Sequence, residues 1–150
     1  MIGALVERED ELVAIARELK TVAVLGIKDA DEPDAPAYSV PALLASTGVR
    51  VIGVNPRVPR ALGSPTLATV AELREAVDVL DVFRRAEFVQ AHADELLALP
   101  PAMRPAVVWL QSGIRDDRSA ERLAAAGYRV VQDRCLGVYR RRALARKVTR

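Results

Sequence analysis

Cysteine, histidine and aromatic residues are scarce in this sequence. The 150 residues include one cysteine, one histidine and 4% aromatic residues. A lone cysteine, Cys135, excludes an intramolecular disulfide and favours a reducing, cytoplasmic compartment. Because aromatic side chains are few, the core must be built from valine, leucine, isoleucine and alanine.

The sequence also has no long uninterrupted apolar run at its N-terminus and no large excess of one charge. Five consecutive charged residues occupy positions 7–11, so neither a signal peptide nor a membrane span is expected there. The 22 basic and 20 acidic residues give a net charge of +2, which provides no global attraction to nucleic acid. The basic stretch 142–150 is interpreted as a solvated tail.

Length and composition are typical of one folded domain. The chain has 51% hydrophobic and 28% charged residues, which excludes a disordered chain. It is too short for a binding domain plus a separate catalytic domain. We therefore expect a single domain over 1–150, with its core at about 19–141.

Short β-rich apolar runs alternate with helical patterns along the chain. The expected strands cover 21–27, 49–54, 77–83, 106–111 and 128–132, and the expected helices cover 6–19, 38–47, 69–75, 87–99 and 118–126. Apolar runs without alternation are typical of strands that are covered on both faces. The pattern predicts a three-layer, Rossmann-like α/β fold with a doubly wound parallel sheet of about five strands and an extra N-terminal helix.

In such a fold the ligand lies at the carboxyl ends of the strands, so the residues there are informative. After the first strand come Gly26, Ile27 and Lys28, and later Ser39 and Val40 at the start of a helix. A glycine lets the backbone approach a phosphate, and a helix N-terminus offers free N–H groups. The full GxGxxG pattern of a dinucleotide site is missing. Gly26 could equally just end the strand, and Ser39 could equally cap the helix.

Asn55, Pro56 and Arg57 follow the second strand, where NAD sites usually carry an acid that holds the ribose hydroxyls. An amide and a cation instead suit an adenosine ribose that carries an extra phosphate. Both NADP and coenzyme A (CoA) have such a phosphate. The alternative is an ordinary turn with a surface arginine.

Phe83, Arg84 and Arg85 follow the third strand. Two adjacent arginines suit an anionic ligand, because guanidinium groups bind phosphate through several donors. Alternation along an extended chain would send them to opposite sides, so we expect one to meet the ligand and the other to pair locally.

The last two strand ends suit a thin ligand chain. Gln111 and Gly113 follow the fourth strand, and a glycine turn there leaves room for a chain such as pantetheine. Trp109, just before them, is expected in the core. Cys135 follows the fifth strand and could place the thiol on the ligand side of the sheet.

Together, these stretches resemble the small stand-alone CoA-binding proteins. That family is similar to the CoA-binding domain of succinyl-CoA synthetase and of ADP-forming acyl-CoA synthetases. The similar stretches, spread over about 19–141, are VAVLGIKD, YSVPALLASTG, VIGVNPR, VDVLDVFRR, WLQSGI and VVQDRC. The resemblance implies a Rossmann-type fold with CoA held across the loops after the strands.

The resemblance also implies contacts by position. Phosphate contacts fall on Gly26, Ile27, Lys28 and Ser39, adenosine contacts on Asn55, Pro56 and Arg57, and the loop beside them on Phe83 and Arg84. One departure from the family is the acidic loop 29–34, whose charge should repel phosphates.

No catalytic or metal site is evident in the sequence. Succinyl-CoA synthetase and its relatives need a phosphorylated histidine from a further domain. The histidine of this chain, His92, lies in a helical stretch away from the strand ends, where a structural role is expected. A P-loop, a Ser–His–Asp arrangement and a metal-ligand cluster of Cys and His are all missing. Asp78 and Asp81 are expected to be solvated or locally paired.

We therefore expect a nucleotide-binding module for CoA or an acyl-CoA that acts as a carrier, sensor or partner subunit and is not an enzyme on its own. Its partners would be the ligand and possible further copies of the chain or an acyl-CoA-using enzyme, with no nucleic acid and no membrane. An NADP-dependent reductase and a regulatory subunit that has lost its ligand are the alternatives.

Overall fold

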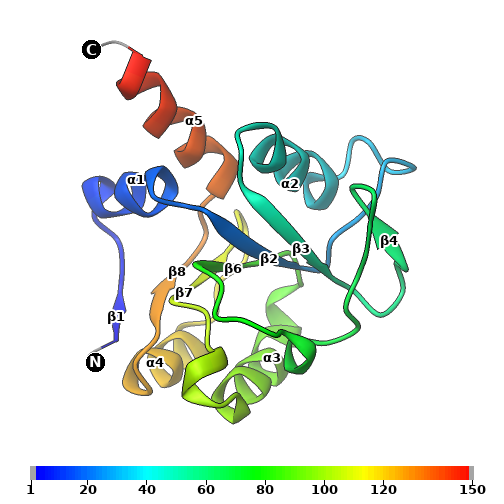
Figure 1. Cartoon of the computed structure of the whole chain (residues 1–150). Helices are drawn as coiled ribbons and strands as arrows, with labels where there is room; N and C mark the ends of the chain where they lie inside the picture. Colours follow the sequence, from blue (N-terminus) through cyan, green and yellow to red (C-terminus); the bar gives the residue numbers. More distant parts are fainter. Residues whose placement is uncertain (1–2, 149–150) are drawn as a thin grey trace.

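A six-stranded parallel sheet forms the middle layer of the protein (Figure 1). The computed structural model describes residues 3–148. The strands are β1 (Ala4–Leu5), β2 (Thr21–Leu25), β3 (Arg50–Val54), β6 (Val79–Val82), β7 (Val107–Leu110) and β8 (Arg129–Val131). They lie in the order β1-β8-β7-β6-β2-β3, and every pair is parallel. This confirms the predicted α/β fold.

The strand order reverses between β2 and β6. From β2 the chain moves to β3 on one side, and it then returns to β6 on the other side of β2 before continuing to β7 and β8. Such a reversal opens a crevice between the loops that follow the two strands, and ligands bind in it in open α/β sheets. The strand register brings the two strand ends beside this crevice level with each other, because Leu25 at the end of β2 pairs with Val82 at the end of β6.

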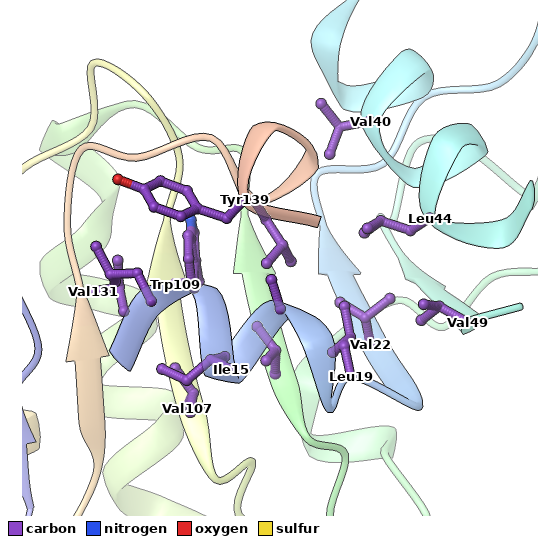
Figure 2. Packing of buried hydrophobic residues seen from close by; sticks show 14 of the residues in the cluster. Ile15, Leu19, Val22, Val40, Leu44, Val49, Val107, Trp109, Val131 and Tyr139 are labelled. Atoms are coloured by element: carbon purple, nitrogen blue, oxygen red, sulfur yellow. The ribbon is translucent and has the colours of Figure 1, made fainter. Parts of the chain in front are cut away.

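Helices cover both faces of the sheet (Figure 1). They are α1 (Glu9–Arg17), α2 (Pro36–Ser46), α3 (Ala86–Ala98), α4 (Asp117–Ala125) and α5 (Leu136–Val148). One hydrophobic cluster joins the sheet to α1, α2 and α5 through residues such as Ile15, Leu44 and Tyr139 (Figure 2). The second cluster joins the other face to α3 and α4 through residues such as Leu96 and Leu123. The central strands are thus covered on both sides, as their continuous apolar character predicts.

Trp109 is fully buried in the first cluster (Figure 2), which confirms its expected place in the core. Its indole Nε1 donates a hydrogen bond to the backbone oxygen of Arg134 at 2.9 Å. The ring meets Tyr139 of α5 edge to face, with 5.7 Å between the centroids. This contact fixes α5 over the carboxyl half of the sheet.

Several short elements differ from the sequence prediction. The chain enters the sheet as β1 before α1 begins at Glu9, whereas the sequence predicts helix from residue 6. The helix predicted over 69–75 is one 3₁₀ turn, η1 (Val70–Glu72), which begins with a capping box between Thr69 and Glu72. A two-stranded hairpin, β4 (Arg60–Ala61) with β5 (Ser64–Pro65), precedes it, and a second 3₁₀ turn, η2 (Pro101–Met103), follows α3.

The basic C-terminal stretch belongs to α5 through Val148, and residues 149–150 lie outside the described residues. Ala143 of this stretch is buried and Arg142 pairs with Glu9 at 3.0 Å, which corrects the interpretation of its first residues as a solvated tail. Arg140 has 6% of its surface exposed. Its guanidinium donates to the backbone oxygens of Ala16 and Arg17 at 2.8 and 3.1 Å, and to that of Thr47 at 3.0 Å. Carbonyl groups at helix C-termini have no partner within their own helix. Arg140 therefore joins the ends of α1 and α2.

Candidate ligand-binding site

A cavity of about 620 Å³ opens at the carboxyl ends of β2, β6 and β7, where the strand order reverses. Its lining consists of Lys28, Ala35, Pro36, Ala37, Phe83, Arg84, Arg85, Ala86, Gln111, Ser112, Gly113, Ile114 and Cys135. The volume falls within the range of about 300–1,000 Å³ that is typical of small-molecule sites. The cavity is therefore the candidate ligand site.

The structure brings together half of the residues that the sequence predicts for the site. Those in the lining are Lys28, Phe83, Arg84, Arg85, Gln111, Gly113 and Cys135. Those outside the lining are Gly26, Ile27, Ser39, Val40, Asn55, Pro56 and Arg57. The first residues of α2, Pro36 and Ala37, also line the cavity and are not among the residues that the sequence predicts for the site. Pro36 is the signal that could have revealed them, because proline is favoured at the first position of a helix.

Gly26 shapes the floor beside the cavity through its backbone. It has φ of 89°, and its N–H donates to the backbone oxygen of Val54 at 2.8 Å. A Cβ atom at this position would lie 2.4 Å from the backbone oxygen of Phe83. Both observations require glycine, which brings the ends of β2 and β6 close together. The next side chain, Ile27, is 1% exposed and packs in the core, so its contact with a ligand would have to come from its backbone.

The N-terminus of α2 lies at the cavity. Ala35 precedes the helix and supplies no side-chain cap, and the lining includes Ala35, Pro36 and Ala37. Pro36 has no N–H, and the N–H groups of Tyr38 and Ser39 donate to the Ala35 oxygen, so the N–H of Ala37 and the helix dipole are what favour an anion at this position. Ser39 is the fourth residue of α2 and does not cap it, because the helix begins earlier than predicted. Val40 is 8% exposed and belongs to the core.

Arg84 and Arg85 both line the cavity, and both also have local partners. The Arg84 Nε donates to Nε2 of His92 at 3.2 Å, and its guanidinium lies 4.5 Å from the Phe88 ring centroid. Arg85 pairs with Glu87 at 3.5 Å. The expected division into one ligand-binding and one locally paired arginine therefore stays a prediction. β6 ends at Val82, so strict strand alternation no longer governs these two side chains.

His92 lies closer to the site than the sequence predicts. It is on α3, its Nδ1 lies 2.6 Å from Oε1 of Glu95, and its Nε2 accepts the hydrogen bond from Arg84. His92 does not line the cavity, but its ring contacts the side chain of Arg84, the second residue after β6, which the sequence does not predict. The signal in the sequence is the spacing of Phe88 and His92, which places both on one face of a helix.

Asn55 joins the loops that follow β2 and β3. Its Nδ2 donates to the backbone oxygen of Ile27, and its Oδ1 accepts from the Arg57 backbone N–H, both at 2.9 Å. This is the local turn bonding that is typical of asparagine before proline. Pro56 and Arg57 are exposed, and their contact with the adenosine end of a ligand stays a prediction.

Two acids of the loop 29–34 have local partners. Glu32 lies 3.6 Å from Nζ of Lys28, and Oδ1 of Asp29 accepts from the Leu62 backbone N–H at 3.2 Å. Pairing with Lys28 partly neutralises Glu32, which reduces the repulsion of a phosphate that the sequence predicts. The same pairing competes with a ligand for Lys28.

The loops after β7 and β8 contribute Gln111, Gly113 and Cys135 to the lining. Gln111 is 4% exposed, and its Oε1 accepts from the backbone N–H of Leu136 at 3.1 Å. Its amide thus ties the end of β7 to the first turn of α5. Cys135 directly precedes α5 and is partly exposed. Cys135 therefore lines the cavity, and contact of its thiol with a ligand stays a prediction.

Asp78 and Asp81 of the third predicted strand behave differently. Asp78 is locally paired, as expected, since its Oδ2 accepts from the backbone N–H groups of Lys20 and Thr21 at 2.8 and 3.0 Å. Asp81 is fully buried, and neither of its carboxylate oxygens has a hydrogen-bond partner among the described residues. The expectation that it is solvated or paired is wrong. Burial raises the pKa of its carboxyl well above the ordinary value, so the neutral form is favoured.

Comparison with known proteins decides the family. The model of the CoA binding domain family matches residues 20–141. The chain belongs to this family. The match begins just before β2, ends within α5, and includes every strand end that lines the cavity.

Relatives of this member of the CoA binding domain family have similar lengths. The chain is 30% identical over 128 residues to the uncharacterized protein YneT of Bacillus subtilis (strain 168), covering 85% of this chain and 90% of YneT. A Thermus thermophilus structure, cell-free ID.343, is 42% identical, with a TM-score of 0.81 and coverage of 91% and 99%. A hypothetical protein from Pyrococcus horikoshii OT3 shares the fold, at 22% identity and a TM-score of 0.80, with coverage of 92% and 93%.

In the part of the chain that the structure describes, none of the helices combines the length and apolar character needed to cross a bilayer.

Proposed function

We propose that the protein binds CoA or an acyl-CoA in the cavity and acts as a carrier, sensor or partner module without catalysing a reaction itself. The observation that carries this proposal is the cavity itself. Its lining combines cationic groups, two arginines and Lys28 beside a helix N-terminus, with uncharged residues and a thiol. CoA has a matching combination, with phosphates at one end and a thin pantetheine chain at the other.

The cationic groups suit the diphosphate of CoA. The N-terminus of α2, Lys28, Arg84 and Arg85 line the cavity. Backbone N–H groups at a helix start bind phosphate oxygens, and guanidinium groups add charge-assisted hydrogen bonds.

The uncharged residues of the lining suit pantetheine. They include Gln111, Gly113, Ile114 and Cys135. A chain that carries amides needs a few polar partners on a mostly apolar wall, and the buried Gln111 amide provides one. The ligand thiol would then lie near Cys135.

The loop after β3 would bind the adenosine end of CoA. This loop has Asn55, Pro56 and Arg57 in place of an acid that would hold unmodified ribose hydroxyls. A cation here favours a ribose that carries a phosphate. Because NADP also has one, the uncharged part of the lining and its thiol are what favour CoA.

A binding role agrees with the groups that line the cavity. The lining contains neither a carboxylate nor an imidazole, and these are the usual general bases. Partners would then be an enzyme that uses acyl-CoA or further copies of the chain.

Mass spectrometry of the supernatant after denaturation of freshly purified protein tests the proposal. We expect CoA or an acyl-CoA at near-stoichiometric amounts, and none after the protein is unfolded, stripped of ligand and refolded. NADP in its place would favour the reductase. A protein that contains no ligand and takes up none from an excess of CoA would favour a regulatory subunit that has lost its ligand.

A further inference from the structure

We infer that His92 is a positioning residue that fixes the guanidinium of Arg84 at the cavity so that it is ready to bind a ligand phosphate. The ligand part of this inference rests on the proposed function. The positioning part concerns the ligand-free protein and can be tested separately.

The hydrogen bonds of His92 define its state. Arg84 Nε is always a donor, so Nε2 of His92, 3.2 Å away, must accept with its lone pair. The imidazole therefore has its proton on Nδ1, which donates to Oε1 of Glu95 at 2.6 Å. Glu95 thus holds both the tautomer and the orientation of the ring. Two hydrogen bonds thus connect the side chains of Glu95, His92 and Arg84 in series.

A second contact restrains the same guanidinium. It lies over the Phe88 ring, 4.5 Å from the centroid, at a distance typical of a cation–π contact. Phe88, His92 and Glu95 follow one another at intervals of four and three residues, and therefore share a face of α3. One helix face thus holds Arg84 at its Nε and at its planar surface. Its terminal Nη1 and Nη2 atoms have no hydrogen-bond partner among the described residues.

Arg85 provides an internal contrast. It lines the same cavity, but its partner Glu87 lies at 3.5 Å, and the two side chains are 82% and 64% exposed. Exposed pairs of this kind hold a side chain weakly. His92 and Glu95 are less exposed, at 17% and 39%. Arg84 is itself exposed, so it is the partly buried His92 and the Phe88 contact that hold it before a ligand arrives, whereas Arg85 has only an exposed partner.

Order in the free protein affects affinity, because a long side chain that is already fixed loses less entropy when a ligand binds. Removing the acceptor on His92 should leave the arginine and its charge present while releasing its orientation. A net hydrogen bond of ordinary strength corresponds to roughly a three- to tenfold change in Kd.

The first test uses the ligand-free protein. The Nε–Hε signal of Arg84 in ¹⁵N NMR spectra, assigned by its loss in Arg84→Lys, should exchange slowly with water. His92→Ala should make that signal exchange rapidly or disappear, and His92→Gln should retain it, because the glutamine side-chain oxygen can accept at the place of Nε2. If His92→Ala does not fold, the same Arg84 signal is measured in Glu95→Ala, which removes the partner that orients the His92 ring. An unchanged signal in the folded variant would overturn the positioning role whether or not the protein binds CoA.

The second test is a double-mutant cycle on CoA affinity, measured by calorimetry. We expect His92→Ala to raise Kd about three- to tenfold, His92→Gln to remain near wild type, and His92→Ala to have no further effect in an Arg84→Ala background. An equal loss in both backgrounds would show that His92 acts through general structure and would overturn the inference. If wild-type protein does not bind CoA while the NMR result holds, the proposed ligand fails and the positioning of Arg84 stands.

Discussion

Replacing Asp81 with asparagine should change how the stability of the protein depends on pH. Asp81 is fully buried on β6, where its register neighbours are Val24 and Trp109. Neither carboxylate oxygen has a hydrogen-bond partner among the described residues. Burial therefore raises the pKa of this carboxyl well above its ordinary value of 3.8. Asparagine has nearly the same shape and cannot ionise.

The sign of the effect follows from proton binding. Because the pKa of Asp81 is higher in the folded state, the folded protein binds more protons than the unfolded chain above about pH 4. The wild-type free energy of unfolding therefore falls as pH rises, by up to about 1.4 kcal/mol per pH unit, until the pH passes the folded-state pKa. Between pH 5 and pH 7 the Asp81→Asn variant should gain up to about 3 kcal/mol relative to wild type.

Thermal unfolding of both proteins at pH 4, 5, 6 and 7 measures this difference in stability between the Asp81→Asn variant and wild type. A gain of that size corresponds to roughly 6–12 °C in Tm for a chain of this length, and the two curves should converge near pH 4. The exposed Asp31→Asn serves as the control for loss of one negative charge, and its gap to wild type should stay nearly constant. A constant gap for Asp81→Asn, or one that favours the wild type more as pH rises, would refute the argument.

Three further predictions concern Arg140, which joins the ends of α1 and α2, and the binding of CoA. Arg140→Ala should lower the free energy of unfolding by about 2–4 kcal/mol, because the carbonyls at the ends of α1 and α2 lose their donor; exposed Arg141→Ala, the control in chemical denaturation, should change it by under about 0.5 kcal/mol. Arg84→Ala and Arg57→Ala should each weaken CoA binding by about 1.5–3 kcal/mol in calorimetry and leave the Tm of the free protein nearly unchanged, whereas wild-type affinity in both variants would make them surface residues. Incubation with CoA disulfide should add one CoA to Cys135 as its thiolate displaces one CoA thiol; intact mass should show an adduct that reductant removes and that Cys135→Ser lacks, and a folded, CoA-binding protein without an adduct would make Cys135 a packing residue.

The layers of the fold could be predicted because they depend on local patterns. The apolar runs around Val24, Leu80 and Val108 are continuous, and each is buried in the sheet. Glycines at 48 and 127 follow α2 and α4 closely, as the helix-stop pattern indicates. The two-residue strand β1 was missed because Ala4 and Leu5 are too few to give a pattern and are exposed. They enter the sheet only through pairing with β8, which is distant in sequence.

The helix α5 shows why a charge pattern alone is ambiguous. A run of arginines without acids is typical of a solvated tail. Arg140 is buried because carbonyls at the ends of two other helices need a donor, and no local pattern reports that need. Arg142 pairs with Glu9 at 3.0 Å across the chain, which is equally invisible in the local sequence.

Residues of the candidate site were predictable to the extent that they follow strands. Lys28, Arg84 and Gln111 each lie just past a strand end and line the cavity. The roles of His92 and Asp81 were not predictable. His92 depends on where the side chain of Arg84 turns after β6, and Asp81 depends on which strands and helices cover its face of the sheet.

Calorimetric titration of ligand-free protein with CoA, NADPH and NAD under one set of conditions tests the central claim most directly. The account predicts one CoA bound per chain, more tightly than NADPH, and the weakest binding for NAD, because the loop after β3 has no acid for unmodified ribose and the cavity extends toward Cys135. Tighter binding of NADPH than of CoA would contradict it.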